Sequence, residues 1–126
     1  MTKEELDALK AADRDGLRIY EYIANHIGDC DNDLVALAEA LRELDLTGQF
    51  TASAARFLHA INADLYAEPV RILVSATIDR DREHSFLPDL MLSIYGPDYA
   101  EHADELSATD NNFRRMYKRL YPGSPM

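Results

Sequence analysis

The least charged part of the chain, from Thr51 to Ile78, constrains the fold most strongly. Its first half places apolar residues three and four positions apart, on one side of a helix: Ala54, Phe57, Leu58, Ile61, Leu65 and Tyr66. We expect the Thr51 hydroxyl to cap this helix. Pro69 disfavours helical geometry in Glu68, but it suits the first turn of a new helix. The stretch therefore predicts two consecutive core helices.

The second half of this stretch fits two kinds of structure. Every second residue from Val70 to Ile78 is apolar and most are β-branched, as in a strand. The same residues also form a helical stripe that includes Leu73 and Thr77. No other segment is a convincing strand partner, and a lone strand would leave its backbone groups unpaired. We therefore predict a helix, with an α+β fold as the alternative, in which residues 70–78 and 90–95 form a small hairpin.

Further helices are predicted on both sides of the central stretch. Thr2 and Glu5 have the spacing of a capping box at the start of a first helix. Ser85 is expected to cap a helix over residues 86–95, and Thr109 or Asp110 to cap the last one. No internal repeat is apparent. We predict an all-α fold, a compact bundle of about six to seven helices that forms one domain over residues 1–121, with a short mobile tail at 122–126.

Composition narrows the cellular context. The chain has 126 residues, which is the size of one domain, and Cys30 is its only cysteine. A single cysteine forms no internal disulfide, which fits a reducing compartment. The charged first 16 residues do not have the apolar core of a signal peptide, and no apolar run is long enough to cross a bilayer. We expect a cytoplasmic protein that does not associate with membranes.

Charge is unevenly distributed along the chain. The formal net charge is −10, which on average repels nucleic acids and anionic membranes. No acidic residue follows Asp110, so the predicted last helix carries the concentrated basic surface, formed by Arg114, Arg115, Lys118 and Arg119. These bases favour the dipole near the end of a helix, and they are also candidate ligands for a phosphate or an acidic surface.

One histidine has two carboxylates at helical spacing. Asp98, His102 and Glu105 would share one side of a helix, where the imidazole could act as a base or as half of a metal site. The simpler interpretation is a surface ion pair. Tyr95 and Tyr99 belong to no apolar stripe and could line a pocket near His102. No nucleophile or oxyanion donor can be placed, so we predict no catalytic residue. Because we prefer the ion pair, we also predict no metal site and no cofactor.

Three functions are compatible with these observations. We favour a small acidic protein-interaction or regulatory protein without catalytic activity. Its partner would be another protein or a second copy of the chain. In one form of this hypothesis, the protein is an inhibitor that mimics the charge of a nucleic acid. The second is weak binding of nucleic acid or phosphate through the four bases of the last helix, although the acidic balance argues against a nucleic-acid partner. The third is a ligand-binding protein or enzyme with its site at Tyr95, Tyr99 and His102.

Overall fold

A computed structural model describes residues 1–123 of the chain, and all regular structure within them is helical. Its α-helices are α1 (Lys3–Ala12), α2 (Leu17–Asn25), α3 (Leu34–Leu44), α4 (Gln49–Asn62), α5 (Ala67–Arg80), α6 (Leu87–Tyr95), α7 (Ala103–Thr109) and α8 (Asn111–Leu120). Two 3-10 turns, η1 (Asp31–Asp33) and η2 (Tyr99–His102), precede α3 and α7.

The all-α prediction is confirmed. Residues 70–78 lie within α5 and residues 90–95 within α6, so the described residues contain no hairpin of the α+β alternative. The predicted tail begins at residue 122, and its last three residues lie outside the described part of the chain. None of the helices described combines the length and the apolar character needed to span a lipid bilayer.

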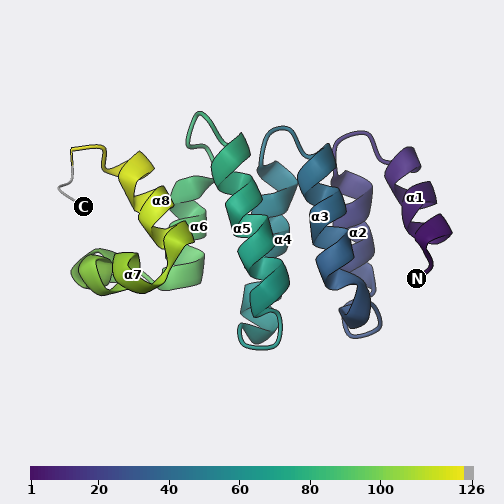
Figure 1. The fold of residues 1–126 in the computed structure, drawn as a ribbon, viewed down its shortest axis with the longest axis horizontal. Helices are drawn as coiled ribbons and strands as arrows, with labels where there is room; N and C mark the ends of the chain where they lie inside the picture. The colour runs from purple at the N-terminus through teal and green to yellow at the C-terminus, as the bar shows by residue number, and fades with distance from the viewer. Residues whose placement is uncertain (124–126) are drawn as a thin grey trace.

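The helices form two layers that run along the long axis of the molecule (Figure 1). One layer contains α2, α4 and α6, and α4 contacts both of its neighbours. The other contains α1, α3, α5 and α8, each in contact with the next. The central stretch of low charge forms α4 and α5, which pack against each other at the middle of the core. The chain therefore stacks helical hairpins side by side, with α1 at one end of the molecule and α7 and α8 at the other (Figure 1).

The three loops that lead into α2, α4 and α6 have the same construction. Each contains a buried aspartate, Asp13, Asp45 or Asp81, exposed by only 5%, 1% and 2%. Each carboxylate accepts hydrogen bonds from backbone N–H groups that open the next helix, and the farthest donor is always six residues on. The aspartates recur at intervals of roughly 35 residues, the length of one hairpin in helical repeat proteins. The structure thus contains a repeated unit that the sequence does not make apparent.

This repeated loop corrects two predicted caps. Helix α4 begins before Thr51, and the Thr51 N–H donates to Asp45 instead of the Thr51 side chain capping the helix. Ser85 does not cap α6 either, since the carboxylate that accepts from the N–H groups at the start of this helix is that of Asp81. Two other predicted caps are confirmed, namely the capping box that Thr2 forms with Glu5 and the Asp110 cap of α8. The capping interactions that form within one helical turn were therefore predicted correctly. The aspartates that cap a helix from across a loop were not predicted.

Gly16 in the first of these loops provides a test of how tightly the repeats pack. Its φ of +106° favours glycine, and an added Cβ would lie 2.8 Å from Leu41 Cδ1. We expect Gly16→Ala to lower the free energy of unfolding by roughly 2–3 kcal/mol, as measured by urea denaturation. Gly28→Ala is the matched control, with a φ of +91° but no atom within 4 Å of the added Cβ. It should cost only about 1 kcal/mol, and equal losses would contradict the packing argument.

Candidate functional site

The exposed side of the α2, α4 and α6 layer, called the α2/α4/α6 face below, is poor in charge. These three helices together contain two acidic residues, Glu21 and Asp89, and two basic residues, Arg18 and Arg56. Their charges cancel, although the whole chain carries −10. The acidic residues are therefore concentrated in the loops and in the other helices. Such depletion of charge is characteristic of the core of a protein–protein interface.

Two open grooves are lined by residues of this layer, one over α4 and one at its edge with α1. The larger, about 580 Å³, runs over α4 and is lined by Tyr20, Ser53, Arg56, Phe57, His59, Ala60 and Ser93. The second, about 530 Å³, lies between α1 and α2 and is bordered by Leu17 and Tyr22. Leu17 and Leu92 are 42% and 46% exposed on the same layer. The face thus offers apolar and aromatic surface in concave places.

The larger groove arises from the way the residues of α4 are divided between the core and the surface. The buried side of α4 consists mainly of small residues together with Leu58, which lets α2 and α6 pack closely. Larger side chains are left at the edge of the helix. Phe50 stacks on Tyr20 of α2 with ring centroids 6.3 Å apart, and Phe57 is half-buried in the groove. The aromatic surface is therefore held by the hairpin packing itself.

Arg56 is the cation of the larger groove. Its side chain is exposed, and within residues 1–123 it makes no ion pair. By contrast, Arg71 pairs with Glu68 and Arg115 pairs with Asp79, both at 2.5 Å. Arg56 is consequently available to a carboxylate from outside the chain, beside the apolar surface of Phe57.

The predicted basic surface on α8 is partly used inside the molecule. Arg115 bonds Ser75 at 3.2 Å and Asp79 at 2.5 Å, and Arg119 donates to the backbone carbonyl of Ile78. These bonds attach α8 to α5. Arg114 donates to the side chain of Asn111, its neighbour on the same helix, while Lys118 is exposed. Two of the four predicted bases thus have structural partners on another helix.

Tyr95 and Tyr99 belong to an aromatic cluster around Phe113. The Tyr95 hydroxyl donates to Asp110 Oδ2 at 2.8 Å, and burial of the phenol together with this carboxylate raises the pKa of Tyr95. The Tyr99 and Tyr121 hydroxyls are 2.6 Å apart. Burial and this hydrogen bond raise the pKa of Tyr99 to about 12. Both predicted site tyrosines therefore use their hydroxyls in contacts within the chain.

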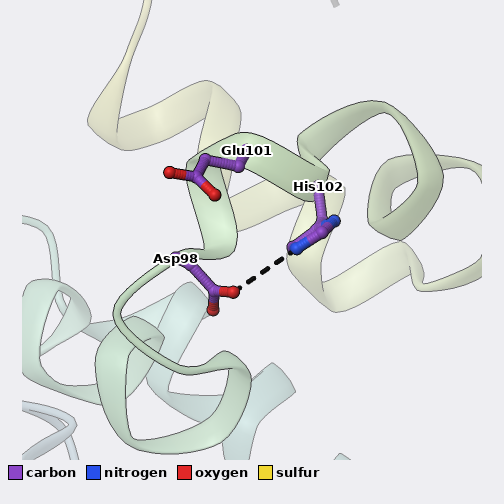
Figure 2. A group of neighbouring side chains, drawn as sticks. All are labelled: Asp98, Glu101 and His102. Atoms are coloured by element: carbon purple, nitrogen blue, oxygen red, sulfur yellow. Dashed lines mark ion pairs between the residues drawn. The ribbon is translucent and has the colours of Figure 1, made fainter.

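His102 lies in a cluster that differs from the predicted one. Its Nε2 is 3.4 Å from Asp98 Oδ2, and the third member of the cluster is Glu101 rather than Glu105 (Figure 2). The predicted surface ion pair between Asp98 and His102 is therefore confirmed. Residues 99–102 form a 3-10 turn before α7 instead of part of an α-helix, and the carboxylate that this turn brings to the pair is that of Glu101. All three clustered side chains are exposed.

Comparison with protein-family models, with curated proteins and with solved structures finds no match to this chain. The α2/α4/α6 face was not predicted from the sequence, although a signal for it exists. The segments 17–25, 49–62 and 87–95 are each poor in charge, and their exposed sides become contiguous only when the hairpins stack.

Proposed function

We propose that this chain is a protein-binding module whose α2/α4/α6 face holds an apolar segment of another protein. The observation that carries the proposal is a charge-poor, grooved face with an unpaired arginine at its centre. Arg56 selects a segment that places a carboxylate beside its apolar residues. Because the rest of the chain is strongly acidic, this carboxylate is expected to be an isolated one in an otherwise uncharged or basic segment.

General features of interfaces support this choice of surface. Stacked helical hairpins present extended surfaces that repeat proteins use for binding. Interface cores are depleted of charge and enriched in aromatic residues and arginine, and arginine and tyrosine are frequent binding hot spots. The larger groove combines Tyr20, Phe57 and Arg56 in this way. A catalytic function has no comparable support among the described residues, since this face contains no clustered acid, base and nucleophile.

The arrangement of the acids argues against the nucleic-acid mimic. A mimic needs free carboxylates spaced along one surface. Here Asp13, Asp45, Asp81 and Asp110 accept backbone hydrogen bonds, and Glu43 pairs with Lys10 at 2.8 Å. The remaining acids are distributed over the loops, the 3-10 turns and every α-helix except α4 and α8. The interaction proposal is therefore kept without its mimic form.

The test compares two charge reversals on different sides of the molecule. We expect Arg56→Glu to weaken retention of a protein partner from the native host's lysate at least about tenfold, because the partner's carboxylate would face a like charge. Lys118→Glu reverses an exposed base on α8 and should leave retention unchanged. Both variants are compared with the unaltered chain in nuclease-treated and untreated lysate, with circular dichroism as the check on folding.

The outcomes separate the alternative functions. Loss of one stoichiometric protein with Arg56→Glu, but not with Lys118→Glu, supports the proposed face. Loss with Lys118→Glu, or recovery that depends on intact nucleic acid, would instead support the basic surface of α8. Equal retention by both variants would reject the α2/α4/α6 face as the binding surface.

A further inference from the structure

We infer that Asp98, Glu101 and His102 form a binding site for a divalent transition-metal ion such as Zn²⁺. One ligand atom from each residue lies within 4.8 Å of the others, and Asp98 Oδ2 and His102 Nε2 are 3.4 Å apart (Figure 2). Donor atoms around tetrahedral zinc are roughly 3.3 Å apart, given bond lengths of about 2.0–2.1 Å. The observed pair therefore already has the separation that a shared ion requires.

The backbone that carries these ligands is anchored from the inside. Tyr99 and Ala103, which directly follow Asp98 and His102 along the chain, are 9% and 7% exposed. The Tyr99 ring packs edge-on against Phe113, and its hydroxyl meets that of Tyr121. The inward residues fix the turn while the three ligands point to solvent. Ion binding then requires side-chain rotation only, without rearrangement of the backbone.

The charge around the cluster favours a cation. No lysine or arginine occurs between Glu83 and Phe113, whereas η2 and α7 together contain Glu101, Asp104 and Glu105. Among the described residues, a single ion pair involves η2 or α7, and it joins His102 to Asp98. One imidazole does not neutralise this group of carboxylates. A divalent ion would supply the missing positive charge at the place where an imidazole and two carboxylates converge.

The donor set indicates the class of ion. Calcium and magnesium prefer oxygen ligands throughout, whereas an imidazole nitrogen with carboxylates suits zinc and neighbouring transition metals. Three protein ligands leave a fourth tetrahedral position for water or for a side chain of another molecule. The sequence analysis preferred a surface ion pair to a metal site and expected Glu105 beside Asp98 and His102, whereas the 3-10 turn brings Glu101 to them.

Calorimetric titration of the full chain with ZnCl₂ tests this site. We expect one zinc ion per chain at this site, and His102→Ala, Asp98→Asn and Glu101→Gln should each weaken its binding at least about tenfold. Glu105→Gln and His26→Ala are the controls, because each removes an exposed candidate ligand outside the cluster and should leave the affinity unchanged. Binding of Co²⁺ provides a second readout through its visible absorption, which should disappear in His102→Ala.

Three results would overturn the inference. The first is that the unaltered chain binds no zinc, and the second is that His102→Ala leaves zinc binding intact. The third is that Glu105→Gln weakens binding as much as the cluster variants do, which would indicate diffuse attraction to an acidic surface. The substituted residues are exposed, so the variants are expected to fold, and far-ultraviolet circular dichroism verifies this. The result is independent of the Arg56 experiment, because no residue of the cluster lines the larger groove.

Discussion

Replacement of Asp45 by alanine is expected to lower the free energy of unfolding by about 4 kcal/mol, which is a large part of the stability of one domain. The side chain is 1% exposed. Its carboxylate accepts from the N–H groups of Thr47, Gly48, Phe50 and Thr51 at 2.8–3.1 Å, and also from the Thr47 hydroxyl at 3.2 Å. Alanine would leave several of these donors buried without a partner, and each such donor costs roughly 1–3 kcal/mol.

The measurement is urea denaturation followed by far-ultraviolet circular dichroism. Asp64→Ala is the matched control, since Asp64 is exposed and should change stability by no more than about 0.5 kcal/mol. Asp45→Asn should lower the free energy of unfolding less than Asp45→Ala does, because the amide oxygen still accepts hydrogen bonds. Some loss remains, since the amide nitrogen cannot accept from the N–H donors that face it. A loss below about 1 kcal/mol for Asp45→Ala would show that water replaces the carboxylate and that the loop does not hold the hairpins together.

The helices were predictable because their signals are local. Hydrophobic spacing identified α4 and the helix over Val70–Ile78 from residues that are neighbours in sequence, and Pro69 lies in the first turn of the second helix as predicted. The break between the two helices lies earlier than predicted, at residues 63–66. The capping box at Thr2 and the Asp110 cap likewise act within one helical turn. Local rules therefore predicted both the fold class and the main core helices.

The repeat was not predictable by the same rules. A buried aspartate in a polar loop has the same appearance in sequence as a solvated one, and only the structure shows the N–H groups around it. The third loop also hides the pattern. Gly16 and Gly48 occupy equivalent positions with positive φ, but the corresponding residue after Asp81 is His84, with φ of +58°. A non-glycine residue is uncommon in this conformation, so the glycine signature is lost where the third unit begins.

The candidate sites depended on contacts between distant segments. Arg115 and Arg119 were predicted as part of an exposed basic surface, yet they bond Asp79 and the Ile78 carbonyl of another helix. Helical periodicity cannot distinguish such an arginine from a free one such as Arg56. The α2/α4/α6 face was missed for the same reason, because its charge-poor segments are separated in sequence by complete helices of the other layer. The site residues were thus less predictable than the fold.

Replacement of Phe113 by alanine is the second change with a large expected effect. The ring is fully buried and lies edge-on to Tyr95 at 4.9 Å and stacked with Tyr117 at 5.6 Å between centroids. Loss of a buried phenylalanine costs about 3–5 kcal/mol, because the transfer energy is lost and a cavity remains. The aromatic cluster connects η2, α6 and α8, so we expect their packing to loosen together.

Urea denaturation measures this loss, and near-ultraviolet circular dichroism locates it. The chain has seven tyrosines and no tryptophan, and Tyr95, Tyr99, Tyr117 and Tyr121 lie in this cluster, so the tyrosine signal should fall with Phe113→Ala even before unfolding. Leu65→Ala is the control, because Leu65 is 61% exposed and should cost below about 1 kcal/mol. Equal stability of the two variants, or an unchanged tyrosine signal, would show that α8 does not depend on Phe113. Helix α8 contacts both α5 and α6. A loss of stability with Phe113→Ala would therefore show that the C-terminal helices unfold together with the core formed by α4 and α5.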